Sequence, residues 1–398
     1  MIARSVIRGL YPFALLAALS FSSLTSAEEV TMDAAHLAHA VDRLSSTTRV
    51  LYIAAHPDDE NTRLLAYLAN GRHVSAQYLS MTRGGGGQNL IGREQDALLD
   101  VLRTQELLAA RALDGATQRF TGARDFGYSK SAAETLDMWG HEQALADVVY
   151  ALRSFQPDVV ITRFDEHPPN HGHHTASAIL AREAFSAAAD PQRFPEQLKN
   201  GLTPWRTTRL LHNVPSWNNT PIPSGALSLD VGLYDPRLGL SYGELAARSR
   251  SQHKSQGFGA AAERGELIER FTLVAGTPAK GDLLEGVEAS WAGRFGAPGA
   301  AVDAALAEAR NKLHRDHPEQ ALPALLRARR ALAALPANDP RVSAALRDSQ
   351  QLAAAMTGLF LRLSATQPSC VPGGALALKL EAVLRRPAKV QLARVRLP

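Results

Sequence analysis

The first half of the chain alternates short apolar runs with longer stretches that repeat apolar residues at helical spacing. Apolar runs at 49–55, 74–82 and 158–162 have the length and composition of buried strands. Residues between these runs are predicted to form three helices, over 59–70, 94–113 and 143–155. Strands separated by helices of this length indicate βαβ units and a mostly parallel sheet. We therefore expect an α/β fold with helices on both faces of the sheet.

The second half has a different pattern. Residues 195–225 are rich in Pro, Trp and Asn and are expected to form irregular loops with short strands, such as 209–213. A helix over 240–250 and a late strand at 271–275 are expected to follow. Residues 300–360 are rich in Ala, Leu and Arg, and Pro336 and Pro340 break them into pieces, which indicates a small helical hairpin. The tail alternates as strands over 375–384 and 389–397. The predicted division is a targeting segment, an α/β domain, a helical segment and a partial β tail, over residues 1–27, 28–290, 291–365 and 366–398. Two strands alone are marginally stable, so the tail either packs on the rest or starts a domain that this chain does not complete.

The first residues have the pattern of a secretory signal peptide. Arg4 and Arg8 precede an apolar stretch over 10–19, and small residues at 25–27 predict cleavage after Ala27. The alternative is an uncleaved membrane anchor, for which the apolar stretch is short. We therefore expect an exported protein, periplasmic or secreted, with no stable membrane span after cleavage.

Composition excludes some partners. The 398 residues are 45% hydrophobic and 21% charged, which is ordinary for a globular protein, and the formal net charge is only +4. No block of Lys and Arg is present, so nucleic acid is not an expected partner. Cys370 is the only cysteine, which excludes an intrachain disulfide, and we expect it to be buried.

A compact polar motif directly follows the first apolar run. His56-Pro57-Asp58-Asp59-Glu60 places an imidazole and adjacent carboxylates at the carboxyl end of a buried strand. Such charges are costly to bury unless something neutralises them, and this edge of an open α/β sheet is where ligands bind. A divalent metal would neutralise them. The alternative is an acidic helix start.

A histidine-rich segment follows the third strand in the same way. Residues 163–174 contain four of the 13 histidines of the chain. In a parallel sheet both loops reach the same edge, so His56, Asp59 and His174 could combine as a ligand set for zinc or a similar ion with an open position for water. The alternatives are a solvated turn or a weak chelating tract.

Four consecutive glycines at 84–87 follow the second strand. No GxGxxG pattern and no Walker lysine accompany them, so a nucleotide site is not indicated, and no G-x-S-x-G elbow suggests a serine hydrolase. The run is either a flexible loop or a loop that faces substrate. Candidate substrate contacts are Arg83, Asn89, Glu94 and Asp165, although charged residues near the loop can also cap the next helix.

These residues resemble a known family. Ala55 to Glu60, the Thr82-Arg83-Gly84 loop and His171-Gly172-His173-His174 are similar to motifs of the PIG-L/LmbE-like N-deacetylases, over roughly residues 46–280. The stretch 249–257 resembles a subgroup of larger secreted members. The resemblance implies a Rossmann-like fold and zinc-dependent hydrolysis of an N-acetyl group, usually on a glucosamine-type sugar.

The resemblance also implies roles for individual residues. His56, Asp59 and His174 would bind the metal, Asp58 would be the general base, and His171 would help to stabilise the oxyanion. His173 stands where the family pattern has an aspartate that sets the charge of the preceding histidine; Asp165 or Glu166 would have to replace that aspartate.

The resulting prediction is a deacetylase that releases acetate and a free amine from an N-acetylated small molecule or glycan. Two alternatives stay open: a metallohydrolase that acts on another amide or an ester, and a secreted carbohydrate-binding protein with a structural metal site. Three protein ligands plus water would indicate catalysis, whereas a fourth protein ligand such as His173 would indicate a structural site.

Overall fold

A computed structural model of the protein describes residues 32–167, 171–215 and 221–394. The predicted signal peptide and its cleavage site lie outside the described residues. Among the described residues, every helix is too short or too polar to cross a membrane.

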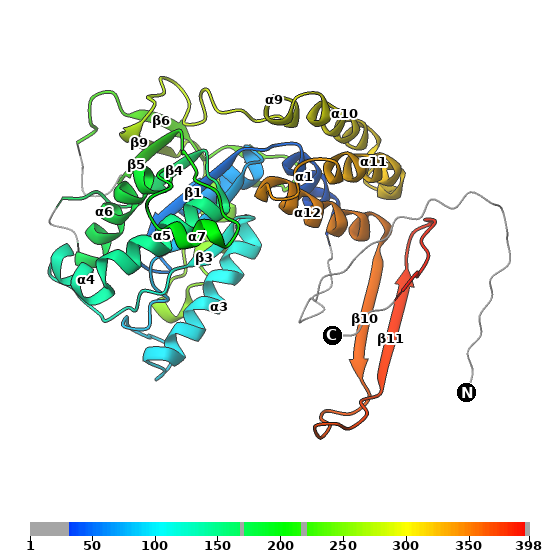
Figure 1. Ribbon diagram of the computed structural model, residues 1–398, viewed down its shortest axis with the longest axis horizontal. Helices are drawn as coiled ribbons and strands as arrows, with labels where there is room; N and C mark the ends of the chain where they lie inside the picture. The colour runs from blue at the N-terminus through cyan, green and yellow to red at the C-terminus, as the bar shows by residue number, and fades with distance from the viewer. Residues whose placement is uncertain (1–31, 168–170, 216–220, 395–398) are drawn as a thin grey trace.

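A seven-stranded sheet forms the centre of the molecule, in the order β3-β2-β1-β4-β5-β9-β6 (Figure 1). The first five strands in chain order are parallel: β1 (Arg49–Ala54), β2 (Ser75–Ser80), β3 (Thr117–Phe120), β4 (Val159–Thr162) and β5 (Arg209–Val214). β9 (Ile268–Gly276) pairs antiparallel with β5, and β6 (Leu227–Asp230) pairs antiparallel with β9. The mostly parallel sheet predicted from the alternating pattern is confirmed.

Helices cover both faces of this sheet. One face packs against α2 (Thr62–Ala66), its π-helical continuation η1 (Tyr67–Gly71), α3 (Asp96–Asp114) and α8 (Tyr242–Arg250). The other face packs against α4 (Ala132–Trp139), α5 (His141–Phe155) and α6 (Gly172–Ala187). The short helix α7 (Pro195–Lys199) follows α6.

The central strand β1 explains why the first apolar run is continuous. Val50, Tyr52 and Ala54 belong to the core on one side of the sheet, and Leu51 and Ile53 to the core on the other. All five side chains are fully buried. A strand that is covered on both faces needs apolar residues at every position rather than at every second one.

A helical unit lies beside the α/β part (Figure 1). It contains α9 (Trp291–Phe295), α10 (Ala297–Lys312), η3 (Pro318–Ala321), α11 (Leu322–Ala333) and α12 (Pro340–Thr357). Helix α1 (Ala34–Leu44), in the range that the sequence assigned to the α/β domain, also packs here, because Leu37 and Val41 share the third core with Trp291. The unit is therefore larger than the predicted hairpin and joins segments far apart in the sequence.

The tail is a two-stranded antiparallel hairpin that projects away from the rest of the molecule (Figure 1). It comprises β10 (Leu359–Ala365) and β11 (Leu378–Leu384). β10 lies within the range predicted as helical, so the β tail starts earlier than expected. Residues 389–394, the described part of the last predicted strand, are not a strand. Cys370 lies in the exposed connection, so the expectation that it is buried was wrong.

Several short elements were not predicted. They include β3, β6, α4 and α7, the ladder of β7 (Tyr234–Asp235) with β8 (Leu240–Ser241), and the 3₁₀ turn η2 (Lys254–Gln256); the longer helix α1 was not predicted either. Helix α2 starts at Thr62 rather than at Asp59, because the side chain of Asn61 caps it by accepting a hydrogen bond from the Leu64 N–H at 3.1 Å. The residues of the acidic motif are therefore free to make a loop.

Candidate metal centre

The two predicted motifs meet at the carboxyl edge of the sheet. β1 and β4 are neighbouring parallel strands, with Ile53 paired to Thr162. The acidic motif follows β1, and the histidine-rich segment runs into the first turn of α6, whose N-cap is His171. Parallel pairing thus brings together residues that are more than a hundred positions apart.

His56, Asp59 and His174 form one cluster whose ligand atoms all lie within 4.8 Å of one another. One oxygen of Asp59, Oδ2, lies 3.1 Å from His56 Nδ1 and also accepts the backbone N–H of His56 at 2.7 Å. The other oxygen, Oδ1, lies 3.5 Å from His174 Nε2. A carboxylate between two imidazoles is the ligand set predicted from the sequence, and it is suited to a divalent cation.

The electrostatics of this cluster favour an ionised carboxylate. Burial alone would raise the pKa of Asp59, but the imidazoles of His174 and His56 outweigh it and hold that pKa well below its ordinary value. Burial alone would lower the pKa of His56, but the charge and hydrogen bond of Asp59 raise it overall. Asp59 is therefore ready to act as an anionic ligand.

His173 and His171 lie next to this cluster and form a second group with His56. His173 is fully buried; its Nδ1 is 3.0 Å from His56 Nε2 and 3.7 Å from an oxygen of Asp125. Burial lowers the pKa of His173 to about 3 and that of His171 to about 4, and neighbouring imidazoles add to both shifts. Both side chains are therefore neutral at physiological pH. A three-histidine group is a second arrangement that could hold a cation.

The carboxylate beside His173 is Asp125, not Asp165 or Glu166. Glu166 forms an ion pair with Arg182 at 2.7 Å, and Asp165 accepts the backbone N–H of His167 at 2.9 Å in a local turn. Asp125 lies in the loop before α4, which the sequence pattern had not resolved. The carboxylate nearest to the residue that stands at the family's aspartate position thus comes from another loop.

Asp58 is held by a buried arginine that the sequence did not single out. Arg103 Nη2 donates to Asp58 Oδ1 at 2.5 Å, and Arg103 Nη1 donates to the carbonyl of Gly84 at 3.0 Å. Gly84 has φ +80°, and a Cβ there would lie 2.4 Å from the guanidinium, so this first residue of the glycine run must be glycine. Arg250 also donates to the backbone carbonyl of Asp58 at 2.7 Å. No described residue forms a hydrogen bond with the second carboxylate oxygen of Asp58.

Aromatic rings form one wall of the site. Phe164 stacks on His174 with ring centroids 3.8 Å apart, and Tyr128 contacts His171 edge-on at 4.9 Å. Tyr128 is 76% exposed, which puts an aromatic face at the entrance, where a sugar ring could pack against it. Below the site, the hydroxyl of Tyr78 donates to the carbonyl of His56.

The acidic motif could have been a helix start, with Glu60 as its first-turn acid, but α2 begins only at Thr62. Glu60 is instead the centre of a buried network. Its Oε1 lies 2.8 Å from His253 Nε2 and accepts from Arg111 Nη2 at 3.2 Å. Arg111 also binds Asp114, which accepts from Ser249 at 2.7 Å. The stretch 249–257, noted for its sequence, therefore anchors the acidic motif to α3 and α8.

The structure does not bring the four candidate substrate residues into the cluster. Arg83 donates to Thr104 at 2.9 Å and lies over the Phe120 ring. Asn89 bonds Glu94 at 3.1 Å, within their own exposed loop. Asp165 belongs to the local turn described above. Their substrate contacts stay predictions.

Residues missed from the sequence share a recognisable pattern. Arg103, Arg111 and Asp114 lie on the buried face of α3. The residues whose spacing predicted this helix are exposed: Leu98, Val101, Leu102 and Leu108. The recurrence of Arg103, Arg111 and Asp114 at helical spacing was the available signal. No such local signal identifies Asp125.

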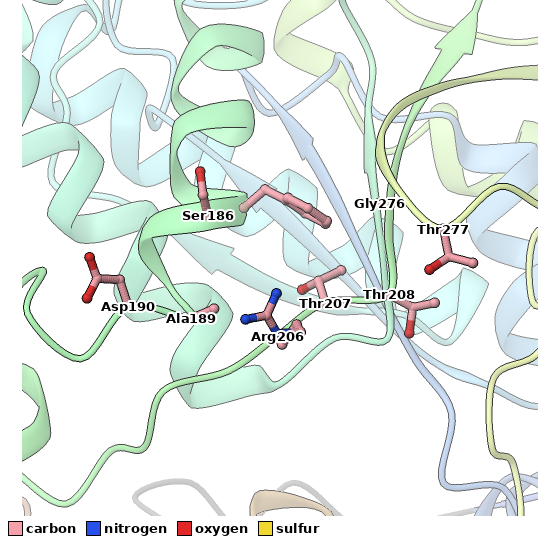
Figure 2. Close-up of a pocket in the computed structure, with 9 residues that line it drawn as sticks. Ser186, Ala189, Asp190, Arg206, Thr207, Thr208, Gly276 and Thr277 are labelled. Carbon is pink, nitrogen blue, oxygen red and sulfur yellow. The ribbon is translucent and has the colours of Figure 1, made fainter.

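A separate cavity of about 540 Å³ lies at the opposite edge of the sheet, before β5 and after β9 (Figure 2). Arg206, Asp190 and Thr208 supply its polar lining. The cavity is far from the histidine cluster in the fold, because β5 runs parallel to β1 and begins at this edge.

Comparisons with known proteins agree with this geometry. The family described as "PIG-L: GlcNAc-PI de-N-acetylase" matches residues 51–185. A 1D-myo-inositol 2-acetamido-2-deoxy-alpha-D-glucopyranoside deacetylase from Thermobispora bispora is 30% identical over 183 residues, 41% of this chain and 58% of that protein. A mycothiol S-conjugate amidase from Streptomyces coelicolor is 26% identical over 38% of this chain and 57% of its own length. The chain thus spans less than two thirds of the length of these relatives.

Among solved structures, an N,N'-diacetylchitobiose deacetylase from Pyrococcus horikoshii matches with 21% identity and a TM-score of 0.41. That match covers 52% of this chain and 70% of that one.

Proposed function

Because residues 51–185 form a PIG-L family domain, we propose that the chain is a metal-dependent hydrolase that removes an N-acetyl group from an N-acetylglucosamine-type sugar or glycoconjugate. The observation that carries the proposal is the His56, Asp59 and His174 cluster with Asp58 beside it. The other metallohydrolase reading, action on a different amide or an ester, draws support from the amidase relative.

The donor set supports zinc as the metal. Two imidazoles and one carboxylate, with ligand atoms within 4.8 Å of one another, are the composition of catalytic zinc sites that leave a position for water. When bound, the cation would polarise the amide carbonyl and lower the pKa of water at the site.

Asp58 is the base in this proposal. Arg103 fixes one of its oxygens, and the other is open to take a proton from the attacking water. The water oxygen bonds to the acetyl carbon, the C–N bond breaks, and both protons of the water end on the leaving nitrogen, the first by way of Asp58. The products are acetate and the amine in its protonated form, so atoms and charge balance without a further reactant.

His171 is suited to stabilise the negative charge that develops on the carbonyl oxygen. Its Nδ1 accepts the backbone N–H of His173 at 3.0 Å, which fixes the neutral tautomer with a hydrogen on Nε2. That N–H is the group available to donate to the oxyanion. Removing a single donor of this kind typically costs about 10²–10³ in kcat.

Cell export belongs to the same proposal. The signal-peptide pattern of the first 27 residues supports a periplasmic or secreted enzyme whose substrates are N-acetylated glycans or small molecules. A secreted carbohydrate-binding protein with a structural metal is the competing function, and the second histidine group, which includes His173, is the observation that favours it.

Acetate release from N-acetylated mono- and disaccharides and glycoconjugates, with zinc content measured on the same preparation, tests the function. We expect turnover that depends on the metal, and about one metal ion per chain. Asp58→Asn should lower turnover by at least about 10²-fold and keep the metal, whereas Asp137→Asn, at an exposed position, serves as a matched control with full activity. A chain that holds its metal and hydrolyses no amide or ester would instead support the binding function.

A further inference from the structure

The face of α3 that points away from the core is apolar. Leu98 is 66% exposed, Val101 59%, Leu102 37% and Leu108 45%, and Ala109 and Ala112 continue the same face. The buried face of the same helix carries Arg103, Arg111 and Asp114 beside Leu99, Leu107 and Ala110. An amphipathic surface helix normally keeps its large apolar residues on the buried face alone. None of the described residues, 32–167, 171–215 and 221–394, covers this outer face.

This face has an internal symmetry. Gln105 is exposed and is the only polar residue at its centre. In helical projection the exposed residues on this face lie at 98, 101, 102, 105, 108, 109 and 112, whereas the exposed Asp96 and Ala97 at the start of the helix lie outside it. These positions are symmetric about 105, as the i±3, i±4 and i±7 neighbours of any helical residue are, so the side chains that they carry decide whether two copies match. If two copies of α3 packed antiparallel with Gln105 on the two-fold axis, each position would meet its mirror position on the partner helix.

That pairing matches side chains by size. Leu98 would face the partner's Ala112, and Val101 would face the partner's Ala109, so that each large residue meets a small one. Leu102 would face the partner's Leu108, and the two Gln105 amides, each a donor and an acceptor, would meet on the axis. Alternation of large and small side chains is how packed helices interdigitate.

We propose that the outer face of α3, with Leu90 and Ile91 in the loop before it, binds the same face of a second copy of this chain in a two-fold antiparallel dimer. Leu90 is 64% exposed and Ile91 66%. The loop is fixed beside α3, because Leu90 N–H donates to the Ser255 carbonyl at 2.8 Å and Ser255 binds Glu106 of α3.

A second copy fits this surface better than a lipid membrane does. The exposed positions of α3 listed above include no Lys or Arg, and of the arginines beside them Arg83 is bound to Thr104 and Phe120, which leaves Arg93 in the loop. Helices that bind membrane surfaces carry a polar face rich in Lys and Arg. One helix and a loop supply less than the about 800 Å² per partner of a standard interface, so we expect a dimer with a Kd on the order of micromolar. The opposite face of α3 holds Asp58 through Arg103, so the dimer would support the helix on which the site rests.

Two substitutions test both the surface and its register. Sedimentation equilibrium of the full chain over about 1–100 micromolar should show a monomer–dimer equilibrium, because this range brackets the expected Kd. Leu102→Glu and Leu108→Lys should each shift the chain to monomer, since each puts a charge against a leucine of the partner. Together in one chain they should restore the dimer, because the antiparallel register places each Glu against a Lys of the partner.

Crosslinking locates the axis. In a Cys370→Ser background, Gln105→Cys should give a disulfide-linked dimer on oxidation. Leu98→Cys is the matched control and should not, because its two copies would lie about 21 Å apart along the helices. Both positions are exposed, and unchanged circular dichroism would show that the fold is kept.

Each contrary result overturns the proposal. A chain that stays monomeric at 100 micromolar has no such dimer, and a dimer that survives Leu102→Glu uses another face. Failure of the double variant to dimerise, or equal crosslinking at positions 98 and 105, contradicts the antiparallel register. Flotation of monomeric chain with phosphatidylcholine–phosphatidylglycerol vesicles would identify a membrane-binding face instead.

Discussion

The buried network around Glu60 gives a sharp prediction of stability. Glu60→Gln keeps the shape of the side chain and removes its charge. The carboxylate is fully buried and meets His253 at 2.8 Å and Arg111 at 3.2 Å. Burial alone would raise the pKa of Glu60, but His253 and Arg111 lower it overall, so the wild-type carboxylate is ionised and paired.

The expected loss of stability depends on which partners of Glu60 are left without an opposite charge in the variant. A hydrogen bond to a charged group contributes about 1.5–3 kcal/mol, and removing one partner of a buried ion pair costs about 3–5 kcal/mol when it leaves a lone charge. Arg111 keeps Asp114 in the variant, so its charge stays paired. We therefore expect a loss near the lower bound, about 2–3 kcal/mol in the free energy of unfolding.

Equilibrium unfolding in urea, followed by circular dichroism at pH 7.5, measures this loss. Glu308→Gln is the matched control, because Glu308 pairs with Lys312 at 2.6 Å on an exposed helix face, and surface pairs contribute little. Because the folded pKa of Glu60 is lowered, its stabilisation is present above the ordinary value of 4.5 and is lost as pH falls through the folded value. The gap between wild type and Glu60→Gln should therefore narrow in acid. A loss no larger than that of Glu308→Gln would refute the reasoning.

Three further predictions concern the site and its surroundings. Asp58→Asn should lower kcat/KM for acetate release by at least about 10²-fold with unchanged zinc content; wild-type rates would exclude it as the base. Chelation with EDTA should abolish turnover and lower the Tm, with recovery on adding zinc, because a ligand that binds only the folded state stabilises it; an unchanged Tm would show that no metal was bound. His73, near His39, Asp42 and the cation Arg237, has its pKa lowered by burial to about 4, so stability should fall as pH drops from 6.5 towards 4. In His73→Gln the Tm should change less with pH than in the wild type. An equal change of Tm with pH in the two proteins would contradict this prediction.

Much of the α/β architecture could be predicted from local patterns. The runs that became β1 and β4 are strands because nearly continuous apolar residues suit a sheet covered on both faces, whereas β2 includes Ser75, Gln77 and Ser80 and is only partly buried at its start. The helix at 94–113 was predicted from Leu98, Val101, Leu102 and Leu108, and α3 is indeed there. Which face of this helix is buried could not be predicted. The spacing of the apolar residues shows that they share one face of the helix, but not whether that face packs on the core or is exposed to solvent. In the structure the charged residues face inward, since Asp58 and Glu60 bind them there.

The candidate site divides in the same way. The sequence by itself indicated His56, Asp59 and His174, because residues that follow parallel strands converge at one edge of the sheet. Only the tertiary structure placed Arg103 on Asp58, Asp125 beside His173 and His253 on Glu60.

Residue type and spacing in the sequence determined which residues could bind a metal. The tertiary structure decided which partners those residues have and how deeply they are buried. A motif encodes residue type and spacing over a few positions, and these are enough to define a strand, a loop and a ligand set. The partners of Asp58, Glu60 and His173 come from segments 45 to about 190 positions away or from separate loops. Such pairing depends on how helices pack on the sheet, which is set by the burial of the whole chain rather than by any local pattern.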